Sequence, residues 1–266
     1  MPVHDIDYRL IGDDLQIVEV ELDPGEAVRA EAGAMLYMDE PVRMDTGTGG
    51  GFMKGLKRRI AGESFFITSF VNEGSKKARV AFSAPYPGKV IPLDLGAHGG
   101  RFLCQKDTFL CAADGTEIEV AFTRKMGAGL FGGEGFILQR LEGDGLAFCH
   151  AGGTIVERDL AGGEVLRVDT GCLVAFSESV DYDIQFQGGF KNALFGGEGL
   201  FLARIEGPGT VYLQSLPFSR LADRIVAASR MYASRGETNR GGAAGLGALG
   251  GLAAGGLLGG LLGEDQ

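Results

Sequence analysis

The sequence predicts an all-β protein made of three repeated modules, followed by a C-terminal helix. The first observation is a repeat, because residues 130–135 (LFGGEG) return letter for letter at 194–199. Over the windows 130–145 and 194–209, eleven of sixteen positions are identical, and a degenerate third copy lies at 61–66. The second observation is strand-like patterning throughout the chain before residue 216. A fixed internal period of this kind is typical of repeat architectures.

Short strands account for the patterning. Residues 18–22 and 117–122 alternate between apolar and polar, as half-buried strands do. Residues 65–71, 79–82 and 211–213 are rich in β-branched and aromatic side chains and are bounded by Gly, Pro or Asn. Many of the 46 glycines fall at matching repeat positions, which suits tight turns between strands.

A second repeated feature precedes each glutamate of the repeated blocks. The turn residues Gly33, Asp107 and Gly171 lie thirty, twenty-seven and twenty-seven residues before the glutamates at 63, 134 and 198. This spacing predicts three modules, at 1–95, 96–160 and 161–216. Each small sheet alone would leave an apolar face in water, so we expect the modules to share one core around a pseudo-threefold axis.

The C-terminal part changes character. Pro217 opens a segment in which apolar residues recur at helical spacing, which predicts a helix over 217–232 that caps the β body. Residues 241–263 contain only glycine, alanine and leucine. Because glycine disfavours helix formation, we expect 241–266 to be a flexible tail. The alternative is a tail that becomes ordered against a membrane or in an oligomer.

Composition limits the function classes. The formal net charge is −10, which disfavours nucleic-acid binding because phosphates attract a basic surface. RNA binding is therefore the weakest alternative. The four cysteines form no C-x-x-C pair and the first residues carry no signal-peptide pattern, so we expect reduced thiols and a cytoplasmic protein.

No cofactor or metal site is predicted. Residues 127–132 match G-x-G-x-x-G, but a strand rather than a helix is expected to follow, so the match is accidental. The chain has three histidines and no H-x-H pair, which argues against a histidine-based metal enzyme. No catalytic residue is nominated.

Two sets of charged residues are candidates for a functional role. The densest basic cluster is a candidate binding surface for anionic lipid or an acidic partner, and it consists of Lys54, Lys57, Arg58 and Arg59. The alternative reading is a solvated loop whose cations pair with nearby acids. The repeated turn carboxylates are expected to be structural, capping their own glycine turns, and they are Glu63, Glu134 and Glu198. Gathered near an axis, they would instead raise each other's pKa or recruit a cation.

These features resemble the AIM24 family, a bacterial domain family of unknown function with a mitochondrial branch. The likeness rests on the three-module layout, the repeated Gly-Glu turns, the segment 31–38 (EAGAMLYM) and the Gly/Ala/Leu tail. It implies a β fold similar to the tryptophan-RNA-binding attenuator protein (TRAP) and related to the double-stranded β-helix. Mitochondrial members are associated with the inner membrane, whereas tryptophan and RNA binding do not carry over, because no motif here supports them.

We therefore expect a non-catalytic binding or scaffold protein. Its expected partners are further copies of itself, an anionic membrane surface or another protein, and its expected location is the cytoplasm or the inner face of the membrane. The alternative is a small-ligand-binding protein or an enzyme that uses carboxylates at the module junctions.

Overall fold

A computed structural model describes residues 3–31, 33–45, 67–124, 136–187 and 200–241 of the chain. The chain divides into two compact units, Met1–Ser219 and Arg220–Gln266. The candidate basic cluster and all three repeated turn glutamates lie outside the described residues.

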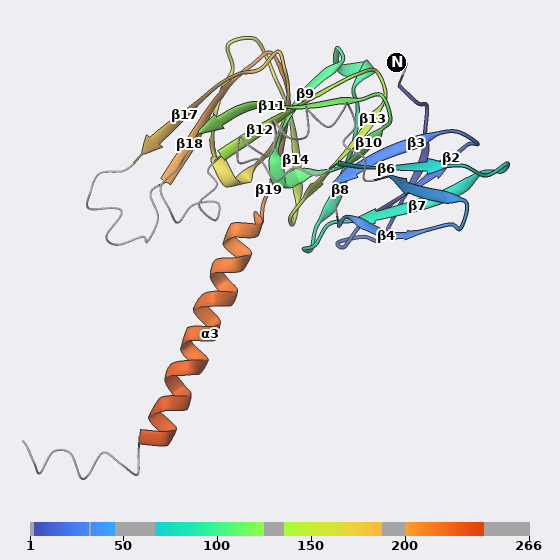
Figure 1. The fold of residues 1–266 in the computed structure, drawn as a ribbon. Coiled ribbons are helices and arrows are strands. Elements are labelled where there is room, and N and C mark those ends of the chain that lie inside the picture. Colours follow the sequence, from blue (N-terminus) through green and yellow to red (C-terminus); the bar gives the residue numbers. More distant parts are fainter. Residues whose placement is uncertain (1–2, 32, 46–66, 125–135, 188–199, 242–266) are drawn as a thin grey trace, which may run out of the picture. The chain divides into compact units, whose positions relative to one another are not determined.

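The first unit is all-β, as predicted, within the part of the chain that the structure describes (Figure 1). Its strands are β1 (Asp7–Ile11), β2 (Ile17–Leu22), β3 (Ala27–Glu31), β4 (Met35–Met38), β5 (Val42–Asp45), β6 (Ile67–Asn72), β7 (Ala78–Ser83), β8 (Lys89–Asp94), β9 (Arg101–Gln105), β10 (Phe109–Ala113), β11 (Glu117–Arg124), β12 (Phe136–Glu142), β13 (Leu146–Ala151), β14 (Ile155–Leu160), β15 (Val165–Asp169), β16 (Leu173–Ser177), β17 (Asp181–Gln187), β18 (Leu200–Glu206) and β19 (Gly209–Gln214). Short 3₁₀ turns are η1 (Gly96–His98), η2 (Lys106–Thr108) and η4 (Thr170–Cys172).

The strands form four antiparallel sheets whose orders are related. Two six-stranded sheets have the orders β5-β6-β3-β10-β13-β8 and β11-β12-β9-β16-β19-β14. Every strand number in the second sheet is six higher than its counterpart in the first. The two smaller sheets, β1-β2-β7-β4 and β15-β18-β17, contain strands that continue the same series. Each predicted strand segment, where described, lies within an observed strand.

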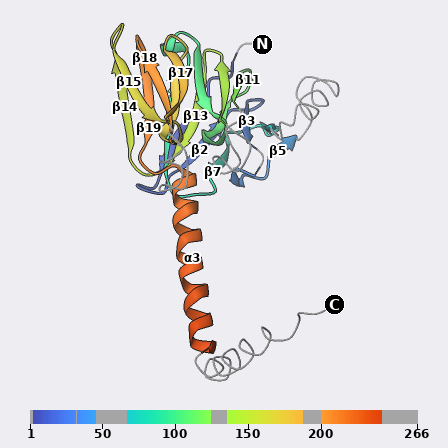
Figure 2. The same cartoon turned by 90° about the vertical axis from the view of Figure 1, so that its left-hand side faces the viewer.

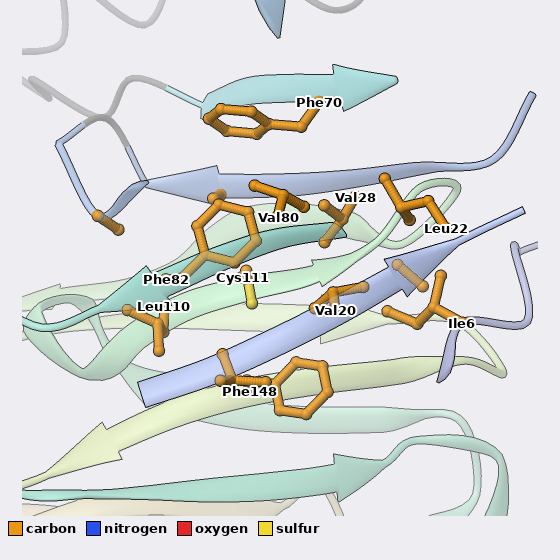
Figure 3. Close-up of a cluster of buried hydrophobic side chains, with 14 of the residues drawn as sticks. Ile6, Val20, Leu22, Val28, Phe70, Val80, Phe82, Leu110, Cys111 and Phe148 are labelled. Atoms are coloured by element: carbon orange, nitrogen blue, oxygen red, sulfur yellow. The ribbon is translucent and has the colours of Figure 1, made fainter. Parts of the chain in front are cut away.

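Alternation explains how the sheets pack. In β2 the side chains of Val18, Val20 and Leu22 are fully buried, and Val20 lies opposite Val80 of β7. This face packs against β3 and β6, where Phe70 meets Phe82 edge to face with ring centroids 5.2 Å apart (Figure 3). Burying one such phenylalanine contributes roughly 1.5–3 kcal/mol to folding.

Among the described residues, the buried hydrophobic side chains form three clusters rather than the one shared core that the spacing predicts. The first cluster centres on β2, β3 and β7, the second on β9, β10 and β13, and the third on β16, β18 and β19. The clusters are separate because a sheet lies between each adjacent pair. Adjacent clusters are separated by a six-stranded sheet that is buried on both faces at its centre, so β10 and β16 are buried along their whole length.

The helix α3 (Phe218–Gly241) follows the last strand directly. It begins one residue after the predicted start and extends beyond the predicted end at 232. The described part of the chain ends at Gly241, the residue at which the glycine-rich segment of the sequence begins. Among the described residues, no helix is both long and apolar enough to span a membrane. The predicted capping of the β body concerns the placement of one unit against the other and stays a prediction.

Candidate functional site

Among the described residues, a group of polar side chains that includes a titratable carboxyl group lies at the junction between the first and second clusters. We call it the junction cluster, and it consists of Glu31, Tyr86, Asp107 and His150. Glu31 ends β3, Tyr86 lies between β7 and β8, Asp107 is in η2, and His150 is in β13. The side chain of Tyr86 donates a hydrogen bond to the backbone oxygen of Asp107 at 3.5 Å, and its ring meets the His150 ring edge-on with centroids 4.5 Å apart.

Burial sets the protonation states in this cluster. Burial, with a smaller contribution from the Asp107 carboxylate, raises the pKa of Glu31 to about 7. Burial lowers the pKa of His150 to about 4, so the imidazole is neutral at physiological pH. The pKa of Tyr86 is raised, mainly by burial and then by the charges of Asp107 and Glu31. Glu31 is therefore the group in this cluster whose charge changes near neutral pH.

His150 is held tightly although its Nδ1 atom has no hydrogen-bond partner among the described residues. The histidine is 2% exposed. A β-carbon added to Gly88 would lie 2.6 Å from its Cε1 and Nε2 atoms and 2.2 Å from the oxygen of Ala151. Gly88 is thus required for β8 to lie beside β13 at this point.

The next junction has amides in the corresponding places. The side chain of Gln105, at the end of β9, donates to the oxygen of Thr170 at 3.1 Å. Gln214, in β19, accepts from the nitrogen of Gly152 and donates to the oxygen of Gly171 at 2.8 and 2.9 Å. Glu31 and His150 replace these glutamines, so one junction is closed by neutral amides and the other holds a titratable carboxyl group. No group of three or more His, Cys, Asp or Glu that could hold a metal occurs in the described ranges.

The sequence prediction missed the junction cluster. The signal was available, because aligning the turn residues Gly33, Asp107 and Gly171 also places Glu31, Gln105 and Asp169 at one position. The prediction instead concentrated on Glu63, Glu134 and Glu198, which lie outside the described residues. In the chain, each of these three glutamates falls between corresponding strands: β5 and β6, β11 and β12, and β17 and β18.

A second feature is the edge of β4. This strand pairs with β7 as β10 pairs with β13 and β16 with β19, with a register shift at Leu36, Leu110 and Val174 respectively. Leu110 and Val174 are 2% and 0% exposed, whereas Leu36 is 53% exposed. The cause is a missing neighbour. Both β10 and β16 have a strand on their other side, β3 and β9, and β4 has none among the described strands.

The edge of β4 is also unprotected by charge. The other edge strands of the described sheets are β1, β5, β8, β11, β14, β15 and β17. Each of them contains charged residues, and β8 contains Pro92 as well. Strand β4 has the sequence MLYM, with neither charge nor proline. Proteins usually protect exposed edges with charge, proline or a bulge, because an apolar edge invites another strand. The register shift at Leu36 does not prevent such pairing, since β10 and β16 carry the same shift and still pair with β3 and β9.

The four sheets and the helix α3 define an all-β protein with a C-terminal helix within the described residues. The chain belongs to the family described as Mitochondrial biogenesis AIM24, which it matches over residues 8–216. The resemblance that the repeated turns indicate is thus confirmed.

Two relatives from Streptococcus pyogenes support the assignment. An uncharacterised protein of the serotype M6 strain is 32% identical over 217 residues, covering 79% of this chain and 85% of the relative. A protein of the same species with a crystal structure superposes with a TM-score of 0.70 at 25% identity, covering 84% of this chain and 99% of the other. The likeness extends over most of the β body and carries no assigned activity.

The close approach at Gly88 generates a stability prediction. Gly88→Ala should lower the free energy of unfolding by about 1–3 kcal/mol, because the new methyl group overlaps Ala151 and the His150 ring. Chemical denaturation followed by circular dichroism measures this. Gly162→Ala is the matched control, since its β-carbon meets nothing within 4 Å, and it should stay within about 0.5 kcal/mol of wild type. Equal stability of the two variants would contradict the described packing.

The raised pKa of Glu31 generates a pH prediction. The folded chain holds the Glu31 proton more tightly than the unfolded chain, so its contribution is greatest below the ordinary pKa and is lost as pH rises through about 7. Glu31→Gln, which copies Gln105, should match wild type near pH 5 and be more stable above pH 7, by on the order of 1 kcal/mol for a half-buried group. Unfolding curves across this range test it, with the exposed Glu117→Gln as control. A pH-independent difference would argue against the assignment.

Proposed function

We propose that this chain is a non-catalytic scaffold that binds a partner strand at the open edge of β4. The observation that carries the proposal is the edge itself. Leu36, Tyr37 and Met38 are 53%, 41% and 37% exposed in succession, on an edge with no protecting charge. Strand addition at such an edge gives affinity through main-chain hydrogen bonds and specificity through side chains.

The scaffold that we propose consists of three tandem repeats. The strand orders support repeats of six strands each, β2–β7, β8–β13 and β14–β19. The second and third of these repeats start one strand earlier than the predicted modules 96–160 and 161–216, and the first leaves out β1, which the predicted module 1–95 includes. The proposed likeness to the TRAP-type β fold depends on these three repeats. A pseudo-threefold arrangement closed by strand pairing would need β15 to pair with β4, and these two described strands do not pair.

The edge of β4 is ordered before any partner arrives. The hydroxyl group of Tyr37 donates to the carboxylate of Glu19 on β2, and Glu19 also pairs with Arg9 at 2.8 Å. This hydrogen bond, ahead of the contribution of Arg9, lowers the pKa of Glu19, so its carboxylate is charged at neutral pH. A fixed edge loses less conformational entropy on binding than a mobile one.

We assign the junction cluster a structural role. Its titratable carboxyl group occupies a place that Gln105 fills elsewhere with one hydrogen bond, and His150 is almost fully buried. The alternative, a ligand site or enzyme that uses junction carboxylates, draws its support from the raised pKa of Glu31 alone.

A second proposed contact is with an anionic membrane surface, at the cytoplasmic inner face. Its support is the sequence, where Lys54, Lys57, Arg58 and Arg59 concentrate positive charge in a chain of net charge −10. Cations near an anionic leaflet each contribute about 1 kcal/mol to binding. The tail 241–266 is proposed to assist.

The edge proposal predicts a change in native size. In extracts of the source cells, the tagged protein should run larger than its 27.9 kDa monomer, and Leu36→Lys should shift it toward the monomer, because a charge on the edge disfavours strand addition. Size-exclusion chromatography with immunodetection measures this. Leu15→Lys is the matched control, since Leu15 is 65% exposed away from the edge. An unchanged size for Leu36→Lys would sink the proposal.

The membrane proposal predicts charge-dependent sedimentation. Wild type should co-sediment with vesicles containing phosphatidylserine and stay in solution with neutral vesicles. Reversing the four basic residues to Glu should weaken binding about tenfold or more, and deleting 241–266 should weaken it further. Equal recovery of all three forms in the pellet would remove the idea.

A further inference from the structure

The strand pairing that joins β2–β7 to β8–β13 occurs again between β8–β13 and β14–β19. In the first instance β10 pairs with β3, with Ala112 opposite Arg29. In the second, β16 pairs with β9, with Phe176 opposite Leu103. Both pairings are antiparallel and run through three consecutive residue pairs. The same structural solution is therefore used at two junctions.

The two contacts also end alike. The nitrogen of Asp114, just after β10, donates to the oxygen of Ala27 at 3.0 Å. The nitrogen of Glu178, just after β16, donates to the oxygen of Arg101 at 3.4 Å. An acidic residue thus follows the inner strand at both junctions, and its backbone nitrogen completes the pairing.

Each of these acidic residues is paired with an arginine. The guanidinium group of Arg29, in β3, forms an ion pair with Asp114. Glu178 pairs with Arg101 and Arg140, each at 3.2 Å. Charge complementarity across the junction therefore accompanies strand pairing at both places.

The strands that would make a third such contact are both unpaired on the relevant side within the described sheets. Strand β4 stands where β10 and β16 stand, and β15 stands where β3 and β9 stand. By the register, the residue of the β4 turn that corresponds to Asp114 and Glu178 is Glu40, and the arginine that corresponds to Arg29 is Arg167 in β15. Both are exposed, and neither forms an ion pair with another described residue.

One chain does not bring these two edges together. Strand β15 pairs with β18, and the two lie side by side (Figure 2). Figure 1 places β18 at one end of the β body and β4 at the other. Met35 of β4 packs against the first buried cluster, whereas Leu166 and Val168 of β15 belong with the third. Pairing between these two edges therefore needs a second molecule.

We propose that β15 of one copy pairs antiparallel with β4 of a second copy, with Arg167 beside Glu40. This inference rests on the proposed strand addition at β4 and names its partner. By the internal registers, Met38 lies opposite Arg167 and Tyr37 opposite Val168, and the nitrogen of Glu40 donates to the oxygen of Val165. The contact covers Leu36 and Val165, which are otherwise exposed.

The contact uses a different edge on each copy, so it is heterologous. Each chain added keeps one β4 edge and one β15 edge free until the assembly closes. Contacts of this kind give rings when the rotation closes and filaments when it does not. The assembly therefore grows with concentration until a ring closes.

Charge reversal tests the pairing with the purified full-length chain at low salt, where ion pairs are least screened. Sedimentation velocity over a concentration series should show assembly of wild type. Arg167→Glu and Glu40→Arg should each weaken association about tenfold or more, because each places like charges together. Lys76→Glu, an exposed reversal in the β6–β7 turn, should leave association unchanged.

Two rescues separate this contact from a general charge effect. A chain carrying both reversals should regain assembly, because the glutamate introduced at position 167 of one copy then meets the arginine introduced at position 40 of the next. An equimolar mixture of the two single variants should assemble for the same reason. Circular dichroism confirms that each variant is folded, as expected for exposed positions.

The outcomes are distinct. Wild type that stays monomeric at every concentration overturns the inference, as does assembly that none of the reversals weakens or that the double reversal fails to restore. If purified wild type is monomeric while Leu36→Lys still reduces the native size in extracts, the edge binds a different protein. The scaffold proposal then stands and the second-copy inference falls.

Discussion

The antiparallel pairing of β10 with β3, and of β16 with β9, is the interaction on which the rest of this structure depends. Without the pairing of β10 with β3, the strands β5, β6 and β3 would share no sheet with β10, β13 and β8. The central strands could then not be buried on both faces, and residues such as Cys111 and Phe148 would lose the packing that places them in the first cluster. Main-chain hydrogen bonds set this geometry, and side-chain burial stabilises it.

The sequence predicts which face of a strand is buried, but it does not predict which strands pair. The alternation in β2 and β7 predicts their buried faces, because side-chain direction has a fixed period of two in any strand. The repeated blocks predict repeated structure. Neither signal says which strands pair, since pairing depends on partners far apart in the chain. The expected shared core fails for that reason, whereas β10 and β16, buried from end to end, are intelligible once their neighbours are known.

The candidate site shows the same division. The sequence identifies repeated glutamates and a dense basic cluster, but it cannot rank carboxylates by burial. Glu31 carries no local signal of its raised pKa, because that pKa depends on burial in the folded chain and, to a smaller extent, on the charge of Asp107 in another element. The sequence does predict where this residue lies in the repeat, because Glu31, Gln105 and Asp169 each precede their turn residue by the same spacing. Gln105 closes its junction with an amide, and Asp169 accepts from the nitrogen of its own turn residue Gly171 at 2.9 Å. The three residues differ because their junctions differ.

Asp169 ends the strand whose outer side has no partner among the described strands, which returns the question to the two terminal sheets. The outer face of β1-β2-β7-β4 carries ion pairs, among them Lys77 with Glu21 at 3.0 Å and Arg79 with Glu21 at 3.2 Å. Such a face is stable in water without a neighbour, as terminal repeats require. The edge of the same sheet is built differently, with apolar side chains and a tyrosine fixed by Glu19. In this sheet, charged side chains keep the outer face soluble, whereas the edge strand β4 is apolar. The face stays hydrated, and the edge of β4 is without a partner among the described strands at the place where β10 and β16 pair with β3 and β9.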